Sequence, residues 1–255
     1  MSRGIEQLVE RQVLRWLEEQ RVSLRPPEPS TTEVLRPVIC VSRQFGALGG
    51  EVGRQVAERL GFSFYGQELV DEIAKQAHVR RKVVESLDER VQTGIRQWVD
   101  ELMVLREFAQ SDYLRNLSQV VLTLGRHGRS VVIGRGAHLI LDPASTLRVR
   151  CYAPTDWRIG QVAERHNLSR SNAHELLLRV DAERAAFYRA HFNADVSDPE
   201  HFDLLLNVSK TSLETCAEIV VGAFEARFAS AAAPPKSQVR ATALNEPPVA
   251  NARAR

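Results

Sequence analysis

The sequence predicts an α/β fold in which helices pack on a parallel sheet. Short apolar runs alternate with longer stretches whose apolar residues recur every three or four positions, the pattern of strands joined by crossover helices. A glycine-dense turn joins the first apolar run to the first helical stretch. Because such crossovers are right-handed, the strands run parallel and their carboxyl ends share one edge of the sheet, where ligands bind.

The segment PVICVSRQFGALGGEVGRQVAERL, residues 37–60, is the most informative part of the chain. Its apolar run ends at Ser42 and Arg43, four glycines follow, and a helical period then begins. Glycines let the backbone close around an anion, and a helix N-terminus offers it free N–H groups. We interpret the segment as a phosphate cradle for a nucleotide, with a purely structural turn as the alternative. The glycines are Gly46, Gly49, Gly50 and Gly53.

The remaining elements follow in order. A helix stop and a short second strand are expected at residues 61–66, and an almost wholly helical region at 67–127. Strands are expected at Ser130–Ile133, Leu147–Tyr152 and Asp203–Val208, with a helix opening at Thr155. The capping-box signal from Thr211 to Glu214 predicts a final helix that ends near Phe228.

Four regions divide the chain. Residues 1–25 carry apolar positions on one helix face, and residues 26–36 form a proline-rich linker that cannot continue this helix. Residues 37–228 form the main domain, and residues 229–255 lack periodicity and are expected to be disordered. The first helix is expected to dock on its own domain, on a protein partner or on a second copy of the chain.

Composition excludes several classes of function. The chain has 255 residues, 34 basic and 32 acidic, giving a net charge of +2, so a nucleic-acid partner is not expected. No apolar run spans a membrane and the N-terminus is charged, which predicts a cytoplasmic protein. The three cysteines are far apart and are expected to be buried thiols. The histidines show no zinc spacing, and His127 and His138 are expected in solvent or packing roles.

Several arginines follow or flank the expected strands. Arg135 stands between two glycines at the end of a strand, where its planar fork suits a phosphate. Arg158 and Arg165 are about two helical turns apart and therefore share a face. Asp181 and Arg184 are one turn apart. The alternatives are a surface arginine in a turn, two solvated cations and a simple salt bridge.

Taken together, these segments resemble the cytidylate kinase-like family, a divergent branch of the nucleoside monophosphate kinases with the P-loop fold. The resemblance covers roughly residues 37–228, and its segments are SRQFGALGGEVG, GFSFYGQELVDEIA, VVIGRGAHLIL, CYAPTDWRI with QVAER, VDAERAAFYRAHFNAD and FDLLLNVSK. It implies a P-loop NTPase-like three-layer sandwich with a helical acceptor-binding insert and a lid. It also implies ATP as the phosphoryl donor, with Mg²⁺, and CMP or dCMP as the leading acceptor.

The resemblance also implies roles for individual residues. Arg158 and Arg165 look like lid arginines that close over the transferring phosphoryl group, and Arg135, Asp181 and Arg184 look like acceptor-binding residues. The donor phosphates would be held by Ser42, Gly46, Gly49, Gly50 and Gly53.

The chain departs from the family pattern in the loop itself. The consensus lysine and its Ser/Thr are missing, so no metal ligand is assigned, and Arg43 is our candidate to take over part of the lysine's role. Ala47 and Leu48 replace the middle of the usual Gly-Ser-Gly-Gly, and Gly66 and Gly136 replace aspartates. A catalytically weak or inactive nucleotide-binding module with a regulatory partner, or a kinase with a non-nucleotide acceptor, is therefore an alternative.

Overall fold

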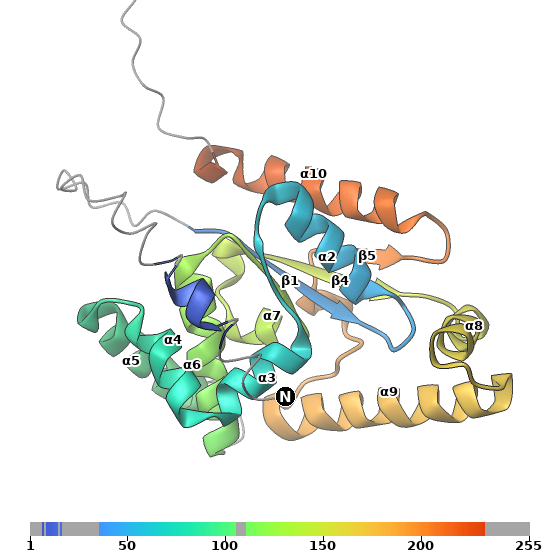
Figure 1. Cartoon of the computed structure of the whole chain (residues 1–255), viewed down its shortest axis with the longest axis horizontal. Coiled ribbons are helices and arrows are strands. Elements are labelled where there is room, and N and C mark those ends of the chain that lie inside the picture. Colours follow the sequence, from blue (N-terminus) through green and yellow to red (C-terminus); the bar gives the residue numbers. More distant parts are fainter. Residues whose placement is uncertain (1–6, 8, 15, 17–35, 106–110, 233–255) are drawn as a thin grey trace, which may run out of the picture.

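The computed structural model describes residues 7, 9–14, 16, 36–105 and 111–232 (Figure 1). Its centre is a five-stranded sheet in the order β2-β3-β1-β4-β5, and every pair of neighbouring strands is parallel. The predicted α/β fold with a parallel sheet is thus confirmed. The strands are β1 (Val38–Arg43), β2 (Ser63–Tyr65), β3 (Ser130–Ile133), β4 (Thr146–Tyr152) and β5 (Leu204–Asn207).

β1 is the central strand and carries the site. Its first five residues are buried, because both of its faces are covered by helices. It pairs with β3 on one side and with β4 on the other, in a register that sets Ser42 beside Arg150 and Arg43 beside Cys151. The sheet therefore delivers the end of β1, the end of β3 and the end of β4 to one edge.

The helices form two layers around the sheet (Figure 1). On one face α2 and α10 pack on alternate residues of β1, β3 and β4, while α3, α4, α5, α6, α7 and the end of α9 form the core on the other. α8 and α9 form a hairpin beside the strand ends, with a small core of its own. The helices are α2 (Gly49–Leu60), α3 (Gln67–Lys75), α4 (Ala77–Glu85), α5 (Glu89–Leu105), α6 (Asp112–His127), α7 (Ala137–Ile140), α8 (Thr155–His166), α9 (Arg170–Phe192) and α10 (Leu213–Ala232), with short 3₁₀ turns at Pro143–Ser145 and Pro199–His201.

The last helix, α10, differs from its prediction in the residue that caps its start. Ser212, and not Thr211, caps it, since the Ser212 hydroxyl accepts a hydrogen bond from the N–H of Thr215 at 3.1 Å. The Thr211 hydroxyl instead contacts the Cys216 thiol at 3.1 Å. Its regular geometry ends at Phe228, as predicted, where φ is −115° and ψ is 20°, and a short further helical turn runs to Ala232. The expected disorder from residue 229 therefore does not hold for residues 229–232, and residues 233–255 lie outside the described part.

The described residues of the N-terminal segment contact the domain. Trp16 is buried and its ring stacks on His127 at 3.7 Å between centroids, while Gln12 accepts a hydrogen bond from Ser63 of β2 at 3.3 Å. The ring nitrogen Nε2 of His127 contacts the Ser86 hydroxyl at 2.8 Å. The segment thus lies against the edge strand β2. The proline-rich linker lies outside the described residues except for Arg36.

Two expectations about buried polar groups are confirmed. Cys40, Cys151 and Cys216 are free, buried thiols. His127 and His138 are both buried and packed against aromatic rings, and burial lowers the pKa of each imidazole to about 3.

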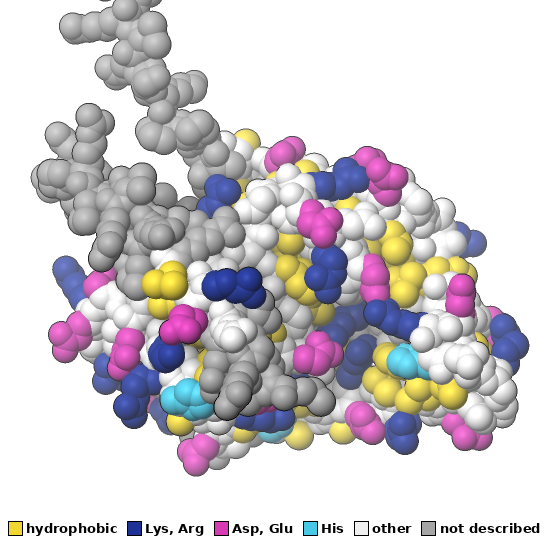
Figure 2. Space-filling model, viewed as in Figure 1, with side chains coloured by type: hydrophobic (Ala, Val, Ile, Leu, Met, Phe, Trp, Pro, Cys, Tyr) yellow, Lys and Arg dark blue, Asp and Glu magenta, His cyan; other side chains and the backbone are white. Residues whose placement is uncertain are grey.

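None of the helices described has the length and apolar character needed to cross a bilayer. Figure 2 shows basic and acidic side chains interspersed over the visible face, in keeping with the small net charge.

Candidate active site

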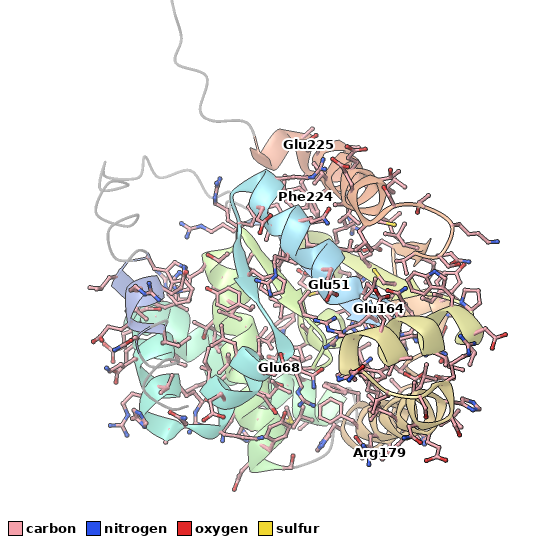
Figure 3. The ribbon with its side chains drawn as sticks, turned by 45° about the vertical axis from the view of Figure 1, so that its right-hand side comes forward. Glu51, Glu68, Glu164, Arg179, Phe224 and Glu225 are labelled. Carbon is pink, nitrogen blue, oxygen red and sulfur yellow. The ribbon has the colours of Figure 1, made fainter. Side chains whose placement is uncertain are left out.

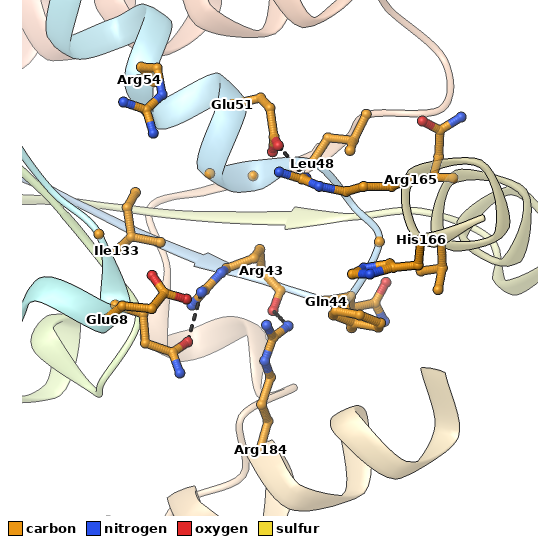
Figure 4. Close-up of a pocket in the computed structure, with 18 of the residues that line it drawn as sticks. Arg43, Gln44, Leu48, Glu51, Arg54, Glu68, Ile133, Arg165, His166 and Arg184 are labelled. Carbon is orange, nitrogen blue, oxygen red and sulfur yellow. Dashed lines mark hydrogen bonds and ion pairs between the residues drawn. The ribbon is translucent and has the colours of Figure 1, made fainter. Parts of the chain in front are cut away.

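A pocket of about 330 Å³ opens at the carboxyl edge of the sheet (Figure 4). The loop between β1 and α2 forms its floor, α8 one wall, and the start of α3 the other. Gly46, Gly49 and Gly50 line it. The N–H groups of Glu51 and Val52 donate to the carbonyl oxygen of Leu48, so the N–H groups of Gly49 and Gly50 are the ones that α2 leaves for an anion. The loop therefore presents the donors and the positive end of a helix dipole that an anion requires.

Arg43 lies at the centre of this pocket. Its Nη2 donates to Oε1 of Gln67 at 2.7 Å, and its Nη1 passes so close to Gly134 that a Cβ there would lie 2.2 Å from it. Glycine after β3 therefore makes room for the guanidinium. Burial lowers the pKa of Arg43, and the nearby Tyr188 and Glu68 only partly oppose this shift, so the cation has lost solvation without forming an ion pair.

Arg184 reaches the same place from α9. Its Nη1 donates to the carbonyl oxygen of Arg43 at 3.1 Å, and its guanidinium carbon lies 5.6 Å from the centroid of the Phe45 ring. Burial, followed by the charge of Arg43, lowers the pKa of Arg184 to about 10. Two partly desolvated cations thus lie side by side, which strongly favours a bound anion between them.

A second pocket of about 260 Å³ shares three residues with the first: Arg43, Gln67 and Arg184. Its other lining residues include Arg135 after β3 and two rings of α9, Phe187 and Tyr188. The two pockets meet at Arg43. Two ligands in these pockets would meet beside two shared cations, an arrangement that suits the exchange of an anionic group between them.

Arg135 is paired with a residue that the sequence analysis missed. Its Nη2 donates to Oδ2 of Asp71 at 2.9 Å, and its guanidinium carbon lies 5.1 Å from the Phe187 ring centroid. Tyr113 donates to the other oxygen of Asp71, and Lys75 donates at 3.2 Å. Burial alone would raise the pKa of Asp71, but these donors and the charge of Arg135 outweigh it and hold the pKa below its usual range. Asp71 therefore remains a carboxylate that orients Arg135.

Arg158 and Asp181 hold the phosphate loop from behind. Arg158 is buried and donates hydrogen bonds to the carbonyl oxygens of Ala153 and Phe45, both at 3.1 Å. It also donates to Oδ2 of Asp181 at 2.5 Å. The other oxygen of Asp181 accepts the N–H of Phe45 at 3.0 Å. Asp181 thus pairs with Arg158 and not with Arg184. Neither Arg158 nor Asp181 lines the two pockets, so both act on the loop backbone in this state.

Arg165 lies at the pocket mouth and is 61% exposed. Its Nη1 pairs with Glu51 in the first turn of α2, so this ion pair joins the loop helix to α8 (Figure 4). In Figure 3, the labelled Glu51, Glu68 and Glu164 come from three different helices, α2, α3 and α8, and the first two line the pocket. A carboxylate therefore occupies the partner position on Arg165 that a phosphate could take.

Two residues predicted to hold donor phosphates lie elsewhere. Ser42 is buried and lines the second pocket, where its hydroxyl accepts from Arg150 at 3.0 Å. Gly53 faces the sheet, and a Cβ there would lie 2.6 Å from Cδ1 of Ile133. Gly53 therefore allows close helix–sheet packing. Leu48 fills a left-handed position of the loop with φ of 49°, where the usual family pattern has glycine.

Comparison with known proteins decides the family. The cytidylate kinase-like family model matches residues 38–210, more than half of the chain. The chain belongs to the cytidylate kinase-like family. Its α/β fold agrees with that of a crystal structure of an uncharacterized protein from Eubacterium ventriosum, with a TM-score of 0.52 at 18% identity over 74% of this chain and 98% of that one. Shikimate kinase from Acinetobacter baumannii, in complex with shikimate, gives a TM-score of 0.42 at 16% identity, covering 76% and 95% of the two chains.

Two cytidylate kinases are similar to this cytidylate kinase-like chain in sequence. The enzyme from Haloquadratum walsbyi is 28% identical over 115 residues, which are 44% of this chain and 60% of that protein. The enzyme from Staphylothermus marinus is 29% identical over 94 residues, which are 36% and 52% of the two proteins. The chain thus spans between half and two thirds of the curated relatives it matches.

The charges of this cytidylate kinase-like site fall into two groups. Within the described ranges, Arg135, Arg158 and Arg165 each pair with a carboxylate, whereas Arg43 and Arg184 bond only to neutral oxygens. Sequence motifs had indicated all five. They did not reveal Arg150 or Gln67, whose partners lie far away in the sequence.

Proposed function

We propose that this protein transfers the γ-phosphoryl group of ATP to a nucleoside monophosphate, with CMP and dCMP as the leading acceptors. The observation that carries the proposal is the meeting of the two pockets at Arg43. ATP would place its phosphates on the loop in the first pocket, and the acceptor would lie in the second between Arg135 and the rings of α9. We propose that the reaction takes place in the cytoplasm.

Phosphoryl transfer requires in-line positioning and positive charge more than covalent chemistry. Arg43 and Arg184 donate only to neutral oxygens among the described residues and form no ion pair there, so an incoming phosphate would meet two cations with no carboxylate in direct contact. Arg165 would exchange Glu51 for a phosphate oxygen as α8 closes over the pocket and excludes water. Arg158 and Asp181 would keep the loop backbone in its binding conformation.

Mg²⁺ is expected to accompany ATP, and the residues present fit a metal held mainly by phosphates and water. Glu51 and Glu68 are the carboxylates that line the first pocket, and of these Glu68 forms no ion pair with any residue of the described part. Glu68 would then be the side chain of this pocket that is free to ligate the metal. Bound there, Mg²⁺ would neutralise charge on the donor phosphates.

A coupled ADP-release assay with a panel of nucleoside monophosphates and small hydroxyl acceptors tests the proposal. CMP or dCMP should give the highest kcat/KM, and Arg43→Ala should lower kcat at least ~10²-fold, as removal of one charge-stabilising donor does elsewhere. Turnover with a non-nucleotide acceptor alone would contradict the acceptor assignment. An unchanged kcat in Arg43→Ala would remove Arg43 from the mechanism.

One observation favours a second candidate, a nucleotide-binding module with little catalysis. Three predicted site arginines are neutralised internally by Asp71, Asp181 and Glu51. This candidate would be supported if the protein bound ATP but released no ADP with any acceptor in the assay above. The N-terminal segment against β2 would then be the place to look for a regulatory partner.

A further inference from the structure

The first pocket contains one basic side chain that no motif of the sequence indicated. Arg54 lies on α2, one helical turn after Gly50, and Figure 4 shows its side chain extending from α2 toward the pocket. Residues four apart share a helix face, and helical side chains lean toward the N-terminus of their helix. The Arg54 side chain therefore leans back toward the junction of loop and helix at Gly49 and Gly50.

The Arg54 guanidinium has no strong partner. It forms no ion pair within the part of the chain that the structure describes, and there it lies over the Phe64 ring, at 4.5 Å from guanidinium carbon to ring centroid. By contrast, Arg59 on the same helix pairs with Glu214 and Glu218 at 3.3 and 3.2 Å, away from the pocket. A cation–π contact at an exposed site is weak, so a phosphate could replace it at little cost.

The loop itself supplies no cation. It reads Gln44 to Glu51 without lysine or arginine, and its one charged side chain is the carboxylate of Glu51. Beyond Arg43 and Arg184 at the pocket centre, and Arg165 paired with Glu51, Arg54 is the remaining guanidinium that lines the first pocket. An arginine fork can bind a phosphate through two parallel hydrogen bonds.

We propose that Arg54 is a phosphate-binding residue, which supplies from the second turn of α2 the positive charge that a lysine-free loop lacks. The inference rests on the proposed binding of a nucleoside triphosphate in the first pocket. Arg54 leaves Phe64 when the phosphates arrive and binds their oxygens beside the first N–H groups of α2. It acts on the anion, and not on the nucleoside.

Calorimetric titration of the full chain with ATP, inorganic tripolyphosphate and adenosine tests this role. Arg54→Ala should weaken ATP and tripolyphosphate binding roughly tenfold or more, as loss of a charged hydrogen bond does, and Arg54→Glu should weaken it further. Adenosine affinity should not change. Arg54→Lys should restore only part of the loss, since an ammonium lacks the planar fork. The matched control Arg59→Ala, on the same helix but outside the pocket, should bind as the wild type does.

The outcomes separate this inference from the proposed function. Wild-type binding of tripolyphosphate with an equal affinity in Arg54→Ala would overturn the Arg54 assignment and leave the proposed function standing. Equal losses for adenosine and tripolyphosphate would also overturn it, because the effect would then be structural. Absence of any ATP or tripolyphosphate binding in the wild type would sink the proposed function and this inference together.

Discussion

Removal of the Asp181 carboxylate should destabilise the protein far more than an exposed charge does. Asp181 accepts from Arg158 at 2.5 Å and from the N–H of Phe45 at 3.0 Å, and the Arg158 side chain is only 6% exposed. Breaking a buried pair costs about 3–5 kcal/mol, because the remaining charge stays buried. Asp181 itself is 29% exposed and Arg158 keeps two carbonyl acceptors, so the lower end applies.

We therefore expect Asp181→Ala to lower the free energy of unfolding by about 3 kcal/mol, and Tm by roughly 6–12 °C. Asp181→Asn should lose about half as much, since its side-chain carbonyl can still accept the Phe45 N–H. Thermal and urea unfolding measure both effects. The control is Glu175→Ala, an exposed position of the same helix. A Tm for Asp181→Ala within the scatter of that control would refute the reasoning.

Three further predictions concern affinity, strain and pH. Glu51→Gln should strengthen ATP binding about fivefold, since ~1 kcal/mol of like-charge repulsion and a competing ion pair are removed; calorimetry against Glu58→Gln measures it. Leu48→Gly should raise the free energy of unfolding by roughly 0.5–1 kcal/mol, because relief of the left-handed φ exceeds the added chain entropy; urea unfolding measures it. His127 and His138 have folded pKa values of about 3, below the unfolded value of about 6.5, so stability present above pH 6.5 is lost as the pH falls toward 3. Between pH 7.5 and 5.5 the two should together cost about 3 kcal/mol, and His138→Phe should remove half of this pH dependence.

Each of these has a clear contrary result. Weaker ATP binding in Glu51→Gln would mean that the carboxylate helps to hold the nucleotide. A lower stability of Leu48→Gly would show that packing of the leucine side chain outweighs its backbone strain. Equal urea midpoints at pH 7.5 and 5.5 would show that the two imidazoles become protonated in the folded protein.

The fold could be predicted from the sequence because each element has a local signal. β1 and β3 are short, mainly apolar runs, β4 alternates apolar residues with two arginines, and α2 and α6 carry one apolar face. Helix ends are harder to predict, since the cap depends on which of two adjacent hydroxyls accepts a hydrogen bond from the first turn of the helix. Ser212, and not Thr211, does so here.

The candidate site could be predicted only in part. The loop and its neighbouring arginines follow strands, so their meeting at one sheet edge follows from the topology. Their partners could not be predicted. Asp71 is 64 positions from Arg135 in the sequence, and its spacing on α3 indicates only an i,i+4 ion pair with Lys75. Gly53 shows the converse, since sequence cannot tell a glycine needed for a phosphate from one needed for a helix–sheet contact.

The adjoining pockets that share Arg43, Gln67 and Arg184 are the core of this account, and a bisubstrate analogue measures them most directly. Calorimetry should compare adenosine and cytidine joined through a pentaphosphate with ATP and CMP alone. We predict that the joined compound binds at least ~10²-fold more tightly than ATP, because one molecule then fills both pockets. An affinity no higher than that of ATP would contradict the claim that the two pockets hold the two partners of one transfer.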